Sequence, residues 1–308
     1  MSCHRQIERA LLTLALAALL SGWSTPARAA LKVFACEPEW AALAQEIGGD
    51  AVSVFSATTA LQDPHQVQAR PSLIARLRNA DLLVCTGADQ EIGWLPILLL
   101  QSANGKVQPG APGYLLAADH VQLLEVPVRL DRALGDLHAQ GNPHIQSAAR
   151  NIAQVIVPLQ ERLALLDPER AGQYQARGAD FRKRWQAAVA RWEARAAPLK
   201  GVPVLTHHKG WIYLINWLGL EEIGVLEPKP GVPPSTAHLN SLLAQLKLKP
   251  AKLVIRAPYD APQASEFISA RLGIPSVVLP YTVGGSERAR DLFGLFDETI
   301  DLLLRAAK

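Results

Sequence analysis

Short apolar runs alternate with amphipathic segments in the first half of the chain. A continuous apolar run of four to eight residues is typical of a buried parallel strand, and apolar positions at helical spacing predict the crossover helices between strands. The predicted strands are residues 31–36, 51–57 and 80–86, and the predicted helices are residues 40–47, 71–79 and 92–100.

The second half of the chain repeats this alternation. Its predicted strands are residues 202–206, 222–226, 253–257 and 276–279, and its predicted helices are residues 210–218, 236–246, 262–272 and 288–307. Each half therefore predicts an α/β lobe with a parallel sheet. Ligands of such sheets bind beyond the carboxyl ends of the strands, so two lobes with facing edges predict a cleft.

A long helical segment separates the two halves. After the Gly- and Pro-rich residues 103–141, a first helix begins near Ser147, and Pro158 is expected to kink or interrupt it. Asp167 and Pro168 then supply an N-cap and a first-turn proline. The second helix spans roughly 45 Å at 1.5 Å per residue. We expect an N-terminal lobe at 30–166, a linking helix at 167–198 and a C-terminal lobe at 199–308.

Residues 1–29 have the pattern of a cleavable signal peptide. A basic start is followed by an apolar run at residues 10–20 and by the small-x-small sequence Ala27-Arg28-Ala29. The apolar run is too short to span a bilayer comfortably. No cysteine follows it directly, so a lipoprotein anchor is not expected. The mature protein is expected to begin at Ala30 in the periplasm, without membrane insertion.

Charge and cysteine content exclude some classes of protein. The net charge of +3 is small and its basic residues are scattered among acids, which argues against nucleic acid as a partner. Cys36 and Cys85 both lie in apolar strand-like runs, and the favoured interpretation is two small buried thiols. A disulfide stays open in an oxidising compartment, but it needs neighbouring strands.

Three histidines follow turns at the expected binding edge. They are His65 after Asp63-Pro64, His144 after Gly141-Asn142-Pro143, and His208 after the strand at 202–206. Neutral imidazoles suit zinc, and a three-histidine site leaves a fourth position for a carboxylate or water. The spacing itself is not a motif, since no pair is at i,i+4. Surface or capping roles therefore remain open for each histidine on spacing alone.

An ordered set of motifs gives the chain a family resemblance. The mature sequence resembles the periplasmic zinc- and manganese-binding receptors of ABC importers over nearly its whole length. The motifs that carry the resemblance are Gln62-Asp63-Pro64-His65, Arg70-Pro71-Ser72, Ala80-Asp81-Leu82-Leu83-Val84, Gly141-Asn142-Pro143-His144, His208-Lys209-Gly210-Trp211, Trp217-Leu218-Gly219-Leu220, Leu226-Glu227-Pro228-Lys229-Pro230-Gly231 and Leu279-Pro280-Tyr281-Thr282-Val283-Gly284-Gly285.

The resemblance implies two α/β lobes joined by one long helix, with metal at their interface. His65 and His144 would be the ligands from the N-terminal lobe and His208 the ligand from the C-terminal lobe. His207 is expected on the other side of an extended backbone. His138 is an alternative ligand or a transient one during loading. We expect His120 and His238 to be surface residues.

The fourth ligand departs from the commoner family pattern. Many relatives carry an acid soon after the last strand, where this chain has Pro280-Tyr281-Thr282. Asp291 is the first candidate and Glu287 the second. An ordinary first-turn acid at Asp291, favoured by the helix dipole, is the alternative, and water is another occupant of the fourth position.

These observations together predict a receptor rather than an enzyme. We expect a soluble monomer that binds one Zn²⁺ and delivers it to an inner-membrane ABC permease, with a periplasmic zinc chaperone as a further partner. Manganese is less favoured because its sites usually want more oxygen ligands. The alternatives are a manganese receptor of the same fold, a three-histidine zinc hydrolase, and an adhesin in which metal is structural.

Overall fold

The computed structural model describes residues 29–127 and 138–308, so nearly all of the predicted signal peptide lies outside the described residues. The chain divides into a first unit, Met1–Ala30, and a second unit, Leu31–Lys308, and the fold of the second unit is described below. Among the described residues, no helix combines the length and the apolarity that crossing a membrane requires.

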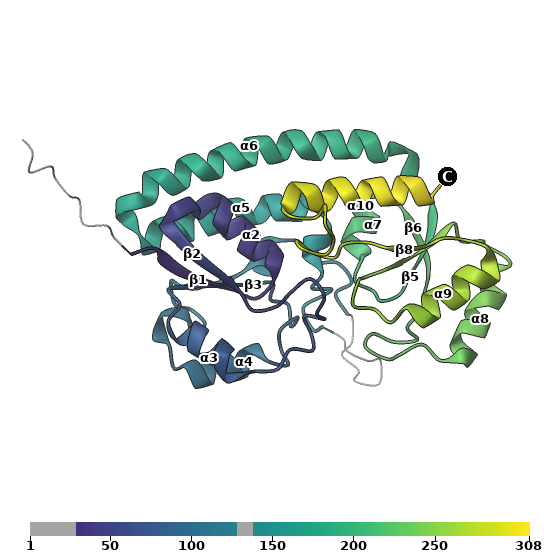
Figure 1. Cartoon of the computed structure of the whole chain (residues 1–308), viewed down its shortest axis with the longest axis horizontal. Coiled ribbons are helices and arrows are strands. Elements are labelled where there is room, and N and C mark those ends of the chain that lie inside the picture. Colours follow the sequence, from purple (N-terminus) through teal and green to yellow (C-terminus); the bar gives the residue numbers. More distant parts are fainter. Residues whose placement is uncertain (1–28, 128–137) are drawn as a thin grey trace, which may run out of the picture. The chain divides into compact units, whose positions relative to one another are not determined.

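The N-terminal lobe is built on a four-stranded parallel sheet of order β2-β1-β3-β4 (Figure 1). Its side chains alternate between two cores, as the pleat requires. Val33 and Ala35 pack with the core that includes α2, whereas Phe34 and Cys36 pack with α3 and α4. The elements are β1 (Leu31–Ala35), α2 (Pro38–Gly48), β2 (Val52–Ser56), α3 (Pro71–Arg78), β3 (Leu82–Cys85), α4 (Leu95–Ser102) and β4 (Tyr114–Leu116).

The C-terminal lobe repeats this plan with the parallel order β6-β5-β7-β8. Val204 of β5 faces the core that α7 and α10 share, and Leu205 faces the core under α8 and α9. The elements are β5 (Pro203–Thr206), α7 (Ile212–Leu218), β6 (Glu221–Val225), α8 (Thr236–Leu246), β7 (Leu253–Arg256), α9 (Pro262–Leu272), β8 (Ser276–Val278) and α10 (Leu292–Ala306). The predicted fold of two parallel-sheet lobes is confirmed.

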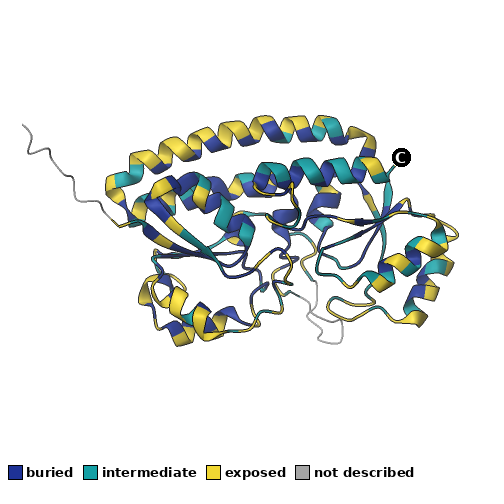
Figure 2. Cartoon of the chain, in the orientation of Figure 1, coloured by how far each residue is buried: buried dark blue, intermediate teal, exposed yellow. Residues whose placement is uncertain are grey.

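The long helix α6 (Ala171–Ala196) links the lobes, flanked by 3₁₀ turns at Pro168–Arg170 and Ala197–Leu199. Figure 1 shows it running above α5 (Ala149–Leu166) and α10. Its inner face is buried and its outer face exposed (Figure 2). Trp185 donates a 2.8 Å hydrogen bond to the carbonyl of Ala149, and Trp192 donates one of the same length to Asp297. The linking helix is thereby anchored to both neighbours.

Of the kink or interruption expected at Pro158, the interruption is wrong, because α5 continues through this residue. Ile152, Val155 and Leu159 are fully buried on either side of the proline. Packing of this apolar face outweighs the loss of one backbone hydrogen bond at a proline.

Candidate metal centre

The structure brings His65, His144 and His208 together. The ring centroids of His65 and His144 lie 5.1 Å apart, as do those of His144 and His208, and those of His65 and His208 lie 6.0 Å apart. His65 lies in the loop after β2, His144 just before α5, and His208 two residues beyond β5. Both lobes therefore contribute to one cluster of imidazoles.

One ring nitrogen of each histidine is already engaged. Nδ1 of His65 lies 2.9 Å from Oδ1 of Asp63, and Nδ1 of His208 lies 2.7 Å from Oε2 of Glu227. Nδ1 of His144 lies 2.7 Å from Oδ1 of Asn142. Because an oxygen acceptor faces each Nδ1, that nitrogen carries the proton, and the lone pair of each neutral ring is left on Nε2.

The orientation of Asn142 is fixed independently. Its Nδ2 donates to Oε2 of Glu125 at 3.0 Å and to the carbonyl of Lys209 at 2.8 Å. Both are acceptors, so the amide oxygen of Asn142 is the atom that faces His144. This assigns the tautomer of His144 without reference to any metal.

The three Nε2 atoms share one further property. Each is buried and has no hydrogen-bond partner among the described residues. A buried polar atom without a partner is costly and needs an explanation. Three imidazole lone pairs, each fixed by an oxygen acceptor behind the ring, are a donor set that fits zinc.

The turns that carry His65 and His144 have the same construction. In each, an Asx side chain two residues earlier accepts hydrogen bonds from both the backbone N–H and the ring Nδ1 of the histidine. The repeated sequence Asx-Pro-His is the signal that could have identified Asp63 and Asn142 as supporting residues. Glu227 carries no comparable local signal, because it reaches His208 across 19 residues of sequence.

Other contacts hold these supporting loops. Trp94 donates a 2.8 Å hydrogen bond from Nε1 to the carbonyl of Pro64. Tyr213 donates one of 2.6 Å to the carbonyl of Asn142. Gly141 has φ +122°, and a Cβ there would lie 2.9 Å from the carbonyl oxygen of Leu124. Any other residue would be strained at this position, so the turn before His144 requires glycine.

A fourth histidine joins the cluster. The ring of His138 lies 5.2 Å from that of His65 and 6.2 Å from that of His144. Burial, and then the charges of His65 and His208, lower its pKa to about 4. Burial also holds the pKa of His144 well below its ordinary value. These two rings are therefore neutral at physiological pH, as metal binding requires.

The carboxylate beside His208 has the opposite effect on the pKa of that ring. Burial lowers the pKa of His208, but the hydrogen bond and charge of Glu227 outweigh it and raise the pKa above its ordinary value. Burial raises the pKa of Asp63, and its contacts with His65 outweigh this and leave the pKa lowered. Negative charge is thus held beside the cluster, where it would offset the charge of a bound cation.

The structure does not bring Asp291 to the histidines. Its carboxylate caps α10 by accepting a 2.7 Å hydrogen bond from the N–H of Gly294, and the residue is exposed. Glu287 is exposed as well. Tyr281, which sequence reasoning did not select as a site residue, is buried instead with its ring 6.1 Å from that of His144.

The remaining histidines lie as follows. His120 is exposed, as expected. His238 is half-buried, and its Nε2 lies 3.1 Å from the carbonyl oxygen of Val225. His207 is buried and lines the same cavity as His208. Its backbone continues the pairing of β5, because its N–H donates to the carbonyl of Ile255 and its carbonyl accepts from the N–H of Glu227. That its side chain points away from that of His208 stays a prediction.

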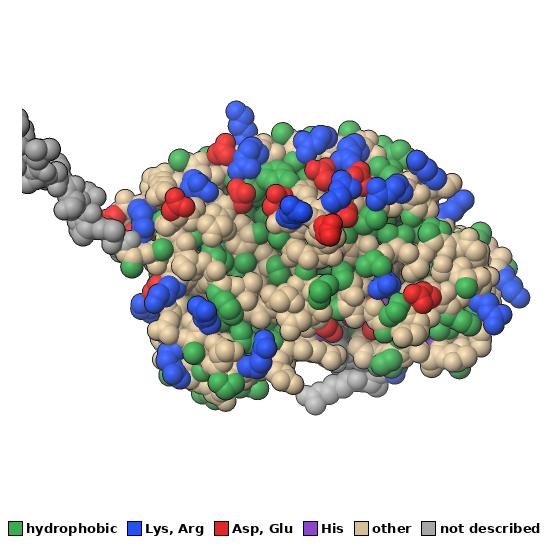
Figure 3. All heavy atoms as spheres, viewed as in Figure 1, with side chains coloured by type: hydrophobic (Ala, Val, Ile, Leu, Met, Phe, Trp, Pro, Cys, Tyr) green, Lys and Arg blue, Asp and Glu red, His purple; other side chains and the backbone are tan. Residues whose placement is uncertain are grey.

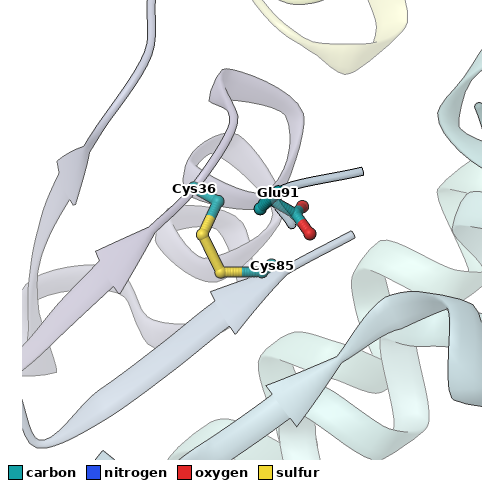
Figure 4. Close-up of side chains that lie close together, drawn as sticks. All are labelled: Cys36, Cys85 and Glu91. Atoms are coloured by element: carbon teal, nitrogen blue, oxygen red, sulfur yellow. A yellow bond between two sulfur atoms is a disulfide. The ribbon is translucent and has the colours of Figure 1, made fainter. Parts of the chain in front are cut away.

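The two cysteines form a disulfide, contrary to the favoured interpretation of free thiols. β1 pairs with β3, and the Cα atoms of Cys36 and Cys85 lie 4.8 Å apart. Figure 4 shows the bonded sulfurs beside Glu91. Ligand atoms of these three residues lie within 4.8 Å of one another, but sulfurs bonded to each other do not provide the thiolates that a metal needs.

Comparison with known proteins identifies the family of the chain. The family model described as zinc-uptake complex component A, periplasmic (ZnuA), matches residues 33–306. The chain belongs to this family. Its members are solute-binding receptors of metal ABC importers.

Individual ZnuA-family relatives are distant. ZnuA of the high-affinity zinc uptake system of Yersinia pestis is 21% identical over 238 residues, which cover 70% of this chain and 72% of that protein. The zinc-binding lipoprotein AdcA of Streptococcus pneumoniae serotype 4 is 20% identical over 236 residues, which are 76% of this chain. The match spans only 46% of AdcA. The iron ABC transporter substrate-binding lipoprotein MtsA of Streptococcus pyogenes serotype M1 is 23% identical over 266 residues, which cover 83% of this chain and 81% of MtsA.

Solved structures show the same fold. A crystal structure of ZnuA superposes with a TM-score of 0.77 at 23% identity, covering 91% of this chain and 100% of that one. The manganese-bound periplasmic metal-binding protein of Candidatus Liberibacter asiaticus gives 0.72 at 16% identity, covering 90% and 100%. The metals named for these proteins differ, so the fold does not select one.

Proposed function

We propose that this chain is a periplasmic zinc receptor that binds one Zn²⁺ through Nε2 of His65, His144 and His208. The observation that carries the proposal is the set of three buried Nε2 atoms without partners, each opposite an Nδ1 that is held by an oxygen acceptor. Such oriented imidazoles are typical of zinc sites with a supporting outer shell.

His138 is the fourth ligand in this proposal, in place of Asp291. Its ring is already within 5.2 Å of that of His65, and burial keeps it neutral. Four imidazoles complete a tetrahedral site and leave no open position for a catalytic water. This arrangement therefore favours binding and transport over hydrolysis.

The donor set is the argument for zinc over manganese. Nitrogen ligands suit zinc, whereas manganese prefers carboxylate, carbonyl and water oxygens. Asp63 and Glu227 are both engaged through hydrogen bonds to the ligand rings. Copper binds imidazoles at least as tightly, so selection against it in the cell rests on metal availability.

The family supports delivery of the bound ion to an ABC permease. The signal-peptide pattern of residues 1–29 supports the periplasm as the compartment. In this proposal the signal peptide is removed before Ala30, and the receptor acts as a monomer. A chaperone that loads the site stays a prediction.

A zinc titration tests the proposal. Metal-free mature protein is titrated against a chromophoric chelator, with His65→Ala, His144→Ala and His208→Ala beside wild type. We expect one tight site in wild type and at least a hundredfold weaker binding in each variant. His138→Ala is expected to weaken binding less, because water can replace one ligand, and exposed His120→Ala is the matched control. Tight binding that is indifferent to the three alanine substitutions would refute the assigned site.

A further inference from the structure

The cleft holds far more space than one ion needs. A cavity of about 740 Å³ adjoins the histidine cluster, and His65, His138 and His208 line one end of it. A zinc ion sits about 2.0–2.1 Å from its nitrogen ligands and fills only a small part of such a volume. The cavity has the size of a small-molecule site, which typically measures about 300–1,000 Å³.

The cavity extends into the C-terminal lobe between α8 and α9. Its apolar wall includes Pro233, Leu239, Tyr259 and Phe267. A concave, mainly apolar surface with a few convergent polar groups is the usual form of an organic ligand site. The polar groups of this cavity indicate which chemistry would bind.

The N-terminus of α9 opens onto the cavity. Its N-cap, Ala261, offers no side-chain acceptor, and Pro262 has no N–H. The backbone N–H groups of Gln263 and Ala264 have no hydrogen-bond partner among the described residues, and both residues line the cavity. Free N–H groups and the helix dipole together favour a carboxylate or another anion at this point.

A second observation points to a ligand at the same place. His207 is 5% exposed and lines the cavity, and its Nδ1 is a buried atom without a hydrogen-bond partner among the described residues. This ring is not part of the proposed zinc site, so its unmet hydrogen bond needs another explanation.

Three acids also line the cavity, namely Asp63, Glu227 and Asp260. Asp260 accepts a 2.7 Å hydrogen bond from the N–H of Ala257 through Oδ2, and Glu227 faces His208. Their negative charge disfavours a purely anionic ligand and favours one that also carries N–H donors. A carboxylate and an amine on one small chelating molecule match both features.

We propose that the cavity binds a small amino-acid-type chelator that is attached to the same zinc ion. Its carboxylate lies at the N-terminus of α9, its amine faces Asp260, and a third donor atom takes the place of His138 on the metal, which keeps four ligands. The cargo is then a zinc chelate rather than the bare ion. This inference rests on the proposed zinc site.

Equilibrium dialysis with radiolabelled L-histidine tests the inference on mature protein loaded with one zinc. We expect one histidine retained per zinc-loaded chain and at least tenfold less without zinc. Histamine, which chelates through two nitrogens but lacks the carboxylate, is expected to be retained at least tenfold less than histidine. Ala264→Phe fills the cavity beside the N–H groups and should abolish retention with zinc affinity changed less than twofold. Exposed Ala270→Phe, on the same helix, is the matched control.

The outcomes separate the inference from the proposed function. Tight zinc binding with no retained histidine, or with zinc stripped by histidine, overturns the chelate and leaves the zinc receptor standing. Retention that is equal for histamine, or unchanged in Ala264→Phe, overturns the assigned position of the carboxylate. Absence of zinc binding in wild type overturns both proposals.

Discussion

Glu39 is an acid buried where the two lobes meet, and it makes folding stability depend on pH. It lies at the start of α2 and is 1% exposed, and it accepts a hydrogen bond from the hydroxyl of Thr282 beyond β8. Burial raises its pKa to about 7 against an ordinary 4.5, although the hydrogen bond from Thr282 lowers it in part. The nearby charge of Glu91 adds to the rise.

The sign and size of the effect follow from the two pKa values. The folded protein holds a proton on Glu39 that the unfolded chain has already lost between pH 4.5 and 7, so stability falls as pH rises. At about 1.4 kcal/mol per pKa unit, the cost of this carboxyl is about 1 kcal/mol at pH 5 and about 3 kcal/mol at pH 8.5. Below pH 4.5 both states are protonated and the cost disappears.

Glu39→Gln removes this titration and keeps the shape and an acceptor oxygen for Thr282. Urea unfolding of the metal-free mature protein, followed by tryptophan fluorescence, measures the free energy of unfolding. We expect the variant to be more stable than wild type by about 3 kcal/mol at pH 8.5 and by about 1 kcal/mol at pH 5. Exposed Glu266→Gln on α9 is the control and should show no pH-dependent difference. An advantage that does not grow with pH would show that the ionised carboxylate is solvated inside the fold.

Three further predictions concern the site and its support. Glu227→Ala should lower zinc affinity about 10–100-fold, because His208 loses the carboxylate that orients it; an unchanged affinity in a competition titration would contradict this. Replacing Cys36 and Cys85 together by serine should lower the free energy of unfolding by about 4 kcal/mol for a separation of 49 residues, with zinc stoichiometry unchanged; a lost zinc would place the disulfide in the metal site. Free zinc at 100 times its Kd should raise stability by about 2.7 kcal/mol in wild type and not in His144→Ala; an equal rise in both, measured by calorimetry, would show that zinc binds elsewhere.

The pattern of apolar residues predicted the two-lobe fold, because this pattern reflects which faces of the strands and helices are buried. A strand covered on both faces is mostly apolar, so β1, β3, β5 and β7 stand out as nearly continuous apolar runs. The carboxyl ends of parallel strands lie at one edge of the sheet, and ligands bind beyond that edge. His65 and His208 each follow a strand, so both could be predicted at this edge of their lobes. These inferences need only local composition and the direction of the strands.

Strand order and side-chain partners were beyond such reasoning. The disulfide depends on β1 lying beside β3, which periodicity does not specify. An acid that follows the last strand can bind a metal or cap the next helix, and the sequence does not distinguish the two roles. The hydrogen bond from the N–H of Gly294 identifies Asp291 as a helix cap. His138 lies near the end of a Gly- and Pro-rich segment with no periodic pattern, so its distance from His65 could not be predicted.

The way the lobes are joined bears on how the proposed receptor selects its ion. Phe181, Trp185 and Trp192 of α6 pack against Phe293 and Phe296 of α10, with ring centroids 5.1–5.6 Å apart in their closest pairs. One apolar core continues through α2, α5, α6 and α10, so a wide opening between the lobes would expose much of it. Discrimination between ions must then come from the rings themselves. Their Nδ1 atoms face Asp63, Asn142 and Glu227, which leaves Nε2 of each ring as the donor atom. In the proposed site these fixed nitrogen donors favour zinc over an ion that prefers oxygen.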